Sequence, residues 1–335
     1  MTGSASRPVR LRRLGTTGFD VSEIGFGTWQ LGADWGDPLP EDTCRDALHA
    51  GLDAGINFVD TADIYGSGRS ERIVGSVLRE RREPVVVATK MGRGPGWEPA
   101  LSAIRAAARG SLERLGVEVL DLVQLHCVPS GVLRDGAVFE HLETIRREGL
   151  IRHYGASVES IEDALFCIRH SGCATLQVIF NLFRQRLIDE LFQGAAVNHV
   201  GIIARVPLAS GVLSGKFSAG HRFQDNDHRA YNADGDCFNV GETFAGVPFP
   251  AAVEFASQIR EILAAESPDA SLAQKALRWI LDFDSVSTVI PGATSARQAR
   301  ENAAASSLPR LGEGAHAALT KLYRQSIAPA VRGVY

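Results

Sequence analysis

The sequence lacks the marks of a secreted, membrane-spanning or metal-binding protein. Its five cysteines are scattered and form no C-x-x-C pair, so we expect a reducing compartment, with neither disulfides nor a metal site. Residues 1–13 contain no apolar core of a secretory signal, and no run of about 18 apolar residues could span a bilayer. The formal net charge of −4 gives no excess of positive charge that would attract nucleic acid or acidic lipid. We therefore expect a cytoplasmic protein without nucleic-acid or membrane partners, and nothing in the sequence indicates its oligomeric state.

Also missing is a G-x-G-x-x-G turn after an early strand, which argues against a doubly wound open sheet. Instead, short β-rich runs alternate with helix-length stretches whose apolar residues recur at three- and four-residue spacing. The apolar run Val85–Ala88 is typical of a parallel strand buried on both faces. This alternation predicts an α/β fold, a (β/α)8 barrel formed by residues 1–335 as a single domain, with a hairpin at Leu11–Val21. The predicted strands are Ile24–Gly27, Phe58–Thr61, Val85–Lys90, Leu120–His126, Ile151–Ser157, Leu176–Asn181, Gly201–Pro207 and Val286–Gly292.

One interval of the chain is too long for this alternation. Residues Lys216–Pro250 are rich in Gly, Asp, Asn and His and lack clear periodicity. A loop of this length inside a compact domain is usually functional, so we predict that it covers a ligand. Further helices are predicted after it at Ala251–Ala264, Ser271–Phe283 and Gly312–Ser326, and helix caps are predicted at Ser70 and Ser160.

Titratable side chains stand at the ends of consecutive predicted strands, where a barrel of this type places its active site. Asp60 ends the second strand, Lys90 the third and His126 the fourth, while Tyr65 lies in the loop after Asp60. Taken singly, each has an ordinary structural explanation, such as a turn for the aspartate, packing for the tyrosine or a core hydrogen bond for the histidine. Their joint placement at one rim favours an active site, because clustered titratable groups perturb one another.

These four groups together could transfer a proton. A phenol has a pKa of about 10, and a nearby ammonium favours the phenolate and lowers that value. Lys90 can act in this way if Asp60 holds its head group in an ion pair. His126 can polarise a carbonyl by donating a hydrogen bond to it. Tyr65 would then be the general acid of a reduction and the general base of an oxidation.

The same residues are part of a wider pattern that resembles the aldo-keto reductase superfamily, in its bacterial and potassium-channel β-subunit-like branch. The resemblance extends from the opening hairpin to about Asn302 and implies a catalytic tetrad with Tyr65 as the proton donor. The implied reaction is reversible hydride transfer between NAD(P)(H) and the carbonyl or alcohol of an aldehyde, ketone or sugar. The segments that carry the resemblance are Gly25–Trp29, Asp60–Gly66, Lys90, Leu125–His126, Pro207–Lys216 and Ile290–Thr294.

The resemblance also implies where a nicotinamide dinucleotide binds. At the nicotinamide end, Val158 stands where asparagine is common, and Arg205 stands where many members stack an aromatic ring. The Arg205 charge should disfavour the cationic, oxidised ring. Asn181 either contacts the cofactor or caps its strand. The implied cofactor-binding residues are Gly27, Thr28, Trp29, Asp60, Ser157, Gln177, Arg205, Pro207, Leu208, Ser210, Gly211, Lys216, Arg229, Ile290, Gly292, Thr294, Gln298, Glu301 and Asn302.

The choice between NADP(H) and NAD(H) follows from the adenosine end. Members that grip the 2′-phosphate strongly carry basic residues where this chain has Gly292 or Thr294, and another where it has Gln298. Arg297 is a basic neighbour one position out of register. NADP(H) is expected as the family default, and NAD(H) stays an alternative.

The substrate and two rival functions stay open at this stage. Trp29, Trp35, Tyr65 and His126 are implied to line an aromatic pocket for a sugar, an aliphatic aldehyde or a polyketide ketone, and Trp97 either joins them or packs in its loop. A strand-end lysine can also form a Schiff base, which would make Lys90 the nucleophile of a lyase. The third class is a cofactor-binding regulatory subunit with little turnover.

Overall fold

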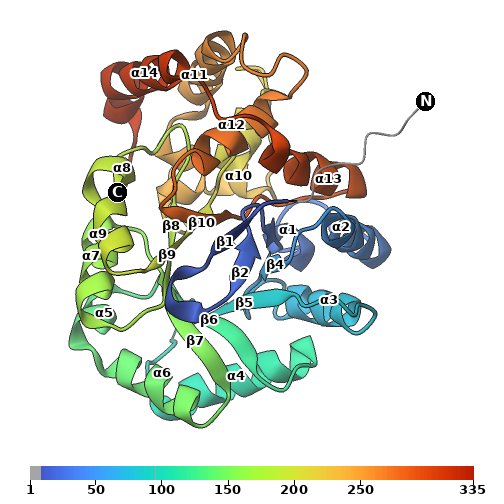
Figure 1. Ribbon diagram of the computed structural model, residues 1–335, viewed down its shortest axis with the longest axis vertical. Coiled ribbons are helices and arrows are strands. Elements are labelled where there is room, and N and C mark those ends of the chain that lie inside the picture. The colour runs from blue at the N-terminus through green and yellow to red at the C-terminus, as the bar shows by residue number, and fades with distance from the viewer. Residues whose placement is uncertain (1–8, 95) are drawn as a thin grey trace.

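The computed structural model describes residues 9–94 and 96–335, and its centre is a curled sheet of eight parallel strands (Figure 1). Each strand pairs with the next one along the chain, so sheet order follows chain order. Two isolated parallel bridges, Ile24 with Val289 and Gly27 with Gly292, join the beginning of this sheet to its end. The predicted (β/α)8 barrel is therefore confirmed. The strands are β3 (Phe26–Gly27), β4 (Phe58–Asp60), β5 (Val86–Met91), β6 (Leu120–His126), β7 (Ile151–Ser157), β8 (Thr175–Ile179), β9 (Gly201–Arg205) and β10 (Val286–Val289).

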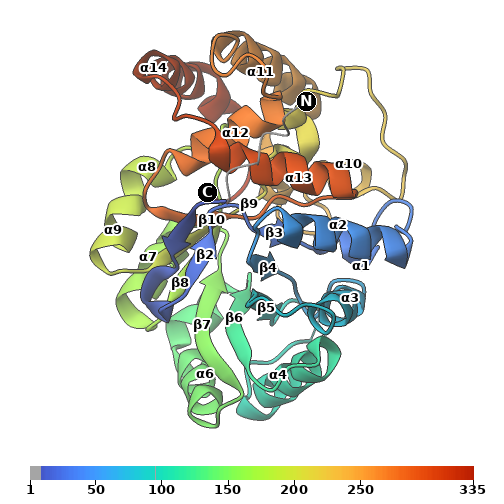
Figure 2. The ribbon, with the colours of Figure 1, turned by 45° about the vertical axis from the view of Figure 1, so that its right-hand side comes forward.

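Helices surround the outer side of the sheet (Figure 2). Amphipathic helices bury one apolar face, as α3 does through Ile73, Val74 and Val77, whereas α12 is buried over most of its length. Within residues 9–94 and 96–335, no helix is both long and apolar enough to cross a membrane. The helices are α1 (Trp29–Gly32), α2 (Glu41–Asp53), α3 (Arg69–Leu78), α4 (Leu101–Leu115), α5 (Ser130–Asp135), α6 (Ala137–Arg147), α7 (Ile161–His170), α8 (Leu187–Glu190), α9 (Phe192–Val197), α10 (His228–Tyr231), α11 (Phe249–Ile262), α12 (Leu272–Leu281), α13 (Ala296–Ala304) and α14 (Glu313–Leu322).

The two predicted helix caps have different outcomes. Ser160 caps α7, because its hydroxyl accepts a hydrogen bond from the backbone N–H of Asp163 at 3.1 Å. The prediction for Ser70 is wrong: Ser70 lies inside α3, whose N-cap is Gly68. The Ser70 hydroxyl donates instead to Thr28 Oγ1 at 2.8 Å, so it ties the helix to the loop after β3.

The predicted hairpin is confirmed, and it closes the amino-terminal end of the barrel. Leu14 and Val21 are fully buried and pack against interior side chains of the strands, among them Phe58. Gly15 has a φ of +52°, and a Cβ there would lie 2.1 Å from the carbonyl oxygen of Ala174, just before β8. A ligand site must therefore open at the other end of the barrel. The hairpin consists of β1 (Leu11–Arg13), η1 (Gly15–Thr17) and β2 (Asp20–Ser22).

The predicted irregular stretch Lys216–Pro250 contains only short helical turns before α11 begins. Phe223 packs between the two ends of this stretch: its ring lies 5.2 Å from that of Phe217 and 5.1 Å from that of Phe249. The buried guanidinium of Arg184 donates to the carbonyl oxygen of Ala245 at 2.9 Å. The three helices predicted after this stretch are α11, α12 and α14. The short turns of the chain are η2 (Ala209–Ser214), η3 (Val240–Glu242), η4 (Phe244–Gly246), η5 (Ala305–Ser307), η6 (Tyr323–Ile327) and η7 (Ala328–Ala330).

Candidate active site

A cavity of about 730 Å³ opens at the carboxyl ends of the strands, a size that suits a small-molecule site. Lys90 does not line it: its side chain is buried and contacts Asp60 and Tyr65, which both do. The cavity is lined by the other predicted residues, Gly27, Thr28, Trp29, Trp35, Asp60, Tyr65, His126, Ser157, Gln177, Arg205, Pro207, Leu208, Ser210, Gly211, Lys216, Arg229, Ile290, Gly292, Thr294, Gln298, Glu301 and Asn302.

Lys90 links the aspartate to the tyrosine. Its Nζ donates to Asp60 Oδ1 at 2.5 Å and to Tyr65 OH at 3.1 Å. The other carboxylate oxygen of Asp60 accepts hydrogen bonds from Gln177 Nε2 at 2.8 Å and Gln124 Nε2 at 3.1 Å. Sequence reasoning missed Gln124, although the parallel register of β5 and β6 places it directly beside Lys90. Asp60 is thus held on both oxygens and orients the ammonium beneath the phenol.

Burial sets the protonation states of the site. It raises the pKa of the Tyr65 phenol, and Lys90 offsets only part of that effect, so our expectation of a lowered value is wrong. Burial alone would lower the pKa of Lys90, but Asp60 and Tyr65 outweigh it and the pKa is raised. Burial, followed by the charges of Lys90 and neighbouring arginines, lowers the pKa of His126 well below its ordinary value. At neutral pH the phenol is therefore protonated, the amine charged and the imidazole neutral.

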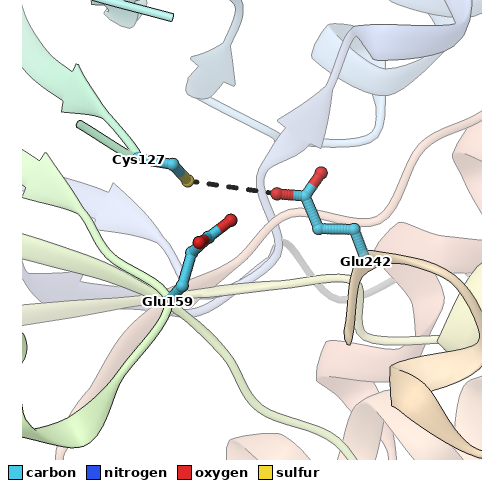
Figure 3. Close-up of side chains that lie close together, drawn as sticks. All are labelled: Cys127, Glu159 and Glu242. Atoms are coloured by element: carbon cyan, nitrogen blue, oxygen red, sulfur yellow. Dashed lines mark hydrogen bonds between the residues drawn. The ribbon is translucent and has the colours of Figure 1, made fainter. Parts of the chain in front are cut away.

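Figure 3 shows three side chains of metal-ligating type, Cys127, Glu159 and Glu242, close together beside this site. Their donor atoms lie within 4.8 Å of one another. Arg205 already contacts two of them, with Nη1 3.1 Å from Glu242 Oε1 and Nη2 3.5 Å from Cys127 Sγ. Arg93 Nη1 lies 2.9 Å from the same oxygen of Glu242. Because two guanidinium charges repel a metal cation, we interpret the group as an ion-pair network.

Comparisons with known proteins identify the family of the chain. The model of the Aldo/keto reductase family matches residues 23–324, which is most of the chain. The chain belongs to the aldo/keto reductase family. The uncharacterized oxidoreductase YqkF of Bacillus subtilis is 30% identical to it over 335 residues, covering 97% of this chain and 100% of YqkF.

Two further relatives place this aldo/keto reductase within its family. A probable voltage-gated potassium channel subunit beta of Oryza sativa subsp. japonica is 30% identical, over 88% of this chain and 90% of its own. An aldo-keto reductase of Klebsiella pneumoniae, solved in complex with NADPH, is 26% identical with a TM-score of 0.71, over 95% of this chain and 96% of its own. The resemblance to the bacterial and channel-subunit-like branch is thus confirmed.

The loop after β9 in this aldo/keto reductase has a strained backbone. Val206, Ala209 and Ser210 have φ values of 54°, 45° and 54°, a region that side chains disfavour, and Gly211 follows at 90°. Such strain persists where the surroundings enforce it, typically at ligand sites. Asn181 supports the loop by donating to the carbonyl oxygen of Val206 at 2.9 Å, and it does not line the cavity. Its side-chain oxygen also accepts from the Phe183 N–H at 2.8 Å just after β8, which favours the strand-capping alternative.

Two cations, Lys216 and Arg229, face the cavity beyond this loop, and the carboxylate of Asp227 offsets only part of their charge. Burial lowers the pKa of Lys216, and the charge of Arg229 lowers it further. Arg229 is held by Asp227 at 2.9 Å and lies 4.7 Å from the ring centroid of Phe223 and 5.4 Å from that of Trp35. A bound phosphate would relieve the repulsion between the two cations.

At the adenosine end of the predicted site, the polar side chains already form hydrogen bonds within the protein. Gln298 Oε1 accepts from the Thr294 N–H and hydroxyl at 2.8 Å each, and Asn302 donates to the carbonyl oxygen of Gly292 at 3.2 Å. Arg297, the basic neighbour, pairs with Glu301 at 2.9 Å on the same helix. A 2′-phosphate would therefore meet a partly neutralised arginine.

Aromatic rings line the part of the cavity that is predicted to hold the substrate. Trp29 lies 5.4 Å from Trp35, 4.7 Å from His228 and 6.5 Å from Tyr65 between ring centroids. Trp97 does not line the cavity and packs instead against the core near Gly92. Sequence reasoning missed His228, which lies beside the predicted Arg229 and had no pattern to distinguish it.

Proposed function

We propose that the protein is an NADP(H)-dependent oxidoreductase that reduces a small carbonyl compound, with Tyr65 as the proton donor. The observation that carries the proposal is the position of Lys90 Nζ, which lies 2.5 Å from Asp60 Oδ1 and 3.1 Å from Tyr65 OH at the cavity wall. The reverse oxidation of an alcohol uses the same groups in the opposite order.

The protonation states suit a reduction. A proton donor has to hold its proton at working pH, and burial keeps the Tyr65 phenol protonated. The charged Lys90 stabilises the phenolate that remains after the proton leaves. Neutral His126 has one ring N–H to donate, so it can polarise the carbonyl oxygen that Tyr65 protonates. Asp60 acts through Lys90 and is a positioning residue.

The cavity fits a nicotinamide dinucleotide, which would supply the hydride when bound. Ser157 faces the end near the tetrad, and the strained loop with Lys216 and Arg229 is suited to a diphosphate. The solved relative from Klebsiella pneumoniae holds NADPH, which supports NADP(H) as the expected cofactor. NAD(H) is the alternative, because Arg297 is paired with Glu301.

The two rival functions are less well supported. A Schiff base needs a neutral amine, whereas Lys90 is paired with Asp60 and its pKa is raised above the ordinary value. A regulatory subunit, as the name of the rice relative suggests for that protein, has no need of a buried lysine that contacts both Asp60 and Tyr65. We therefore favour an enzyme.

The test of this function is a fluorescence titration with NADPH and NADH, followed by a panel of aldehydes, ketones and sugars. We expect saturable binding of NADPH and aldehyde-dependent oxidation of it. The tryptophans at the cavity, Trp29 and Trp35, provide the signal. Tight NADPH binding without turnover on any substrate class would favour the regulatory alternative, and failure to bind either dinucleotide would reject both.

A second prediction concerns the affinity for the oxidised cofactor relative to the reduced one. Arg205 lines the cavity and shares the Glu242 carboxylate with Arg93, so positive charge remains next to the predicted nicotinamide position. Arg205→Trp should tighten binding of NADP⁺ relative to NADPH by about tenfold, because a repelling charge is removed. Arg205→Lys keeps the charge and should keep the ratio. Titration of both forms provides the measurement, and a ratio unchanged in Arg205→Trp would contradict the idea.

A further inference from the structure

Two arginines near the tetrad share one carboxylate. Arg93 Nη1 and Arg205 Nη1 lie 2.9 Å and 3.1 Å from the same atom, Oε1 of Glu242, and all three side chains line the cavity. Lys90 is balanced separately by Asp60. The group of Arg93, Arg205 and Glu242 therefore carries one positive charge in excess.

A second carboxylate near this group, that of Glu159, lies outside the cavity lining. Glu159 approaches Cys127 and Glu242 (Figure 3). It faces Arg184, a buried guanidinium whose pKa is lowered by burial and raised in part by the Glu159 charge. Glu159 and Arg184 line a separate small pocket, and the Glu159 charge acts on Arg184 as well as on Arg205.

Arg93 has two unused donor nitrogens, whereas Arg205 has one, a buried Nε without a partner among the described residues. Only the Nη1 of Arg93 makes a hydrogen bond to a described residue, which leaves Nη2 and Nε free of partners in that part of the chain. Its side chain is 24% exposed, and its guanidinium carbon lies 5.4 Å from the ring centroid of Phe238. Arg205, by contrast, is 8% exposed and uses its second terminal nitrogen on Cys127. A planar guanidinium with free N–H groups matches a carboxylate well.

Arg93 lies close enough to the reacting groups to contact the same small molecule. It follows Lys90 by three positions, just after the end of β5. Its guanidinium carbon lies 5.4 Å from the ring centroid of Phe238, and the ring of Trp29 lies 6.1 Å from Phe238 and 6.5 Å from Tyr65. Arg93 is also among the cations that, after burial and Lys90, lower the pKa of His126.

We propose that the substrate is a carbonyl compound bearing a carboxylate, which binds Arg93 while the carbonyl faces Tyr65 and His126. This inference rests on the proposed function and adds the charge of the substrate to it. The rings of Trp29, Trp35 and Phe238 line the cavity and would hold an apolar or aromatic spacer between the two polar ends.

The test compares 4-carboxybenzaldehyde with 4-formylbenzamide, which has nearly the same shape and no charge. With NADPH, we expect kcat/KM to be about 10- to 100-fold higher for the carboxylate, the effect of one hydrogen bond to a charged group. Arg93→Gln should abolish this preference and Arg93→Lys should keep part of it. Glu242→Gln should increase it, because the competing carboxylate is gone. Arg105→Gln is the matched control, an arginine paired with Glu148 outside the cavity at 2.8 Å.

Equal kcat/KM for the two aldehydes, or a preference that survives Arg93→Gln, would overturn the inference while leaving the reductase function in place. Binding gives a second readout that needs no turnover. Benzoate and benzamide are titrated calorimetrically into the protein with NADP⁺, and benzoate should bind at least tenfold more tightly in a manner that depends on Arg93. If benzoate binds in this way and neither aldehyde is reduced, the anion site stands and the proposed function fails.

Discussion

Tyr65→Phe is expected to lower kcat for carbonyl reduction roughly 100- to 10,000-fold, the contribution of a positioned general acid. The substitution removes only the hydroxyl that lies 3.1 Å from Lys90 Nζ. The ring remains and still packs against His126 at 5.8 Å. The Kd of NADPH should therefore change by less than about threefold, because the loss falls on proton transfer rather than on binding. Steady-state kinetics and a fluorescence titration measure the two quantities on the same preparations.

A control and a pH profile sharpen this experiment. Tyr231→Phe removes a hydroxyl from another tyrosine at the cavity wall and should retain most of the activity. Because the pKa of Tyr65 is raised by burial, kcat/KM for reduction should stay level from neutral pH to about 9 and fall only at higher pH, as the donor loses its proton. A fall that is already complete below neutral pH would assign the proton to His126, whose pKa is lowered, and full activity in Tyr65→Phe would assign it elsewhere.

Lys90→Met is expected to destabilise the fold by about 3 to 5 kcal/mol as well as to stop turnover. Asp60 is only 2% exposed, and its ion pair with Lys90 would be replaced by an uncompensated buried carboxylate. Gln124 and Gln177 would still donate to it, but hydrogen bonds from neutral amides do not replace a charge. Urea unfolding monitored by tryptophan fluorescence measures the loss.

The double variant Asp60→Asn/Lys90→Met separates stability from catalysis. Removing both charges together leaves no unpaired ion, so most of the lost stability should return. Turnover should not return, because no ammonium remains beside the Tyr65 oxygen. A double variant as unstable as Lys90→Met alone would show that the charge of Asp60 is not the cause of the destabilisation.

The strands were predictable because their signal is local. A parallel strand buried on both faces needs a short apolar run, and Val85–Ala88 has this character before any pairing is known. The strand ends were less predictable, because they depend on backbone geometry. We extended the seventh strand to Pro207, but Val206 turns to a φ of 54° and β9 ends at Arg205. We extended the eighth to Gly292, but β10 ends at Val289, just before Ile290 and Pro291.

The candidate site likewise contains residues that the sequence predicts and residues that it does not. The spacing of Asp60 and Tyr65 within one loop is visible in the sequence, and the alternation of strands places Lys90 nearby. Glu242 carries no such signal, because it comes from a stretch without periodicity and reaches Arg93 across 149 positions. The direction of the Tyr65 pKa shift was equally hidden, since it depends on how much of the side chain the folded protein buries.

Because bridges between the beginning and the end of the sheet form part of its wall, we expect the cavity to be completed late in folding. Gly27 and Gly292 line the cavity and pair with each other from nearly opposite ends of the chain. Contacts of such long sequence separation form late, because a long loop has to close first. A chain that stalled before this closure could already hold Asp60 next to Lys90 and yet have no complete groove for a dinucleotide. Binding of the dinucleotide would therefore indicate that the segment around β10 has paired with the segment around β3.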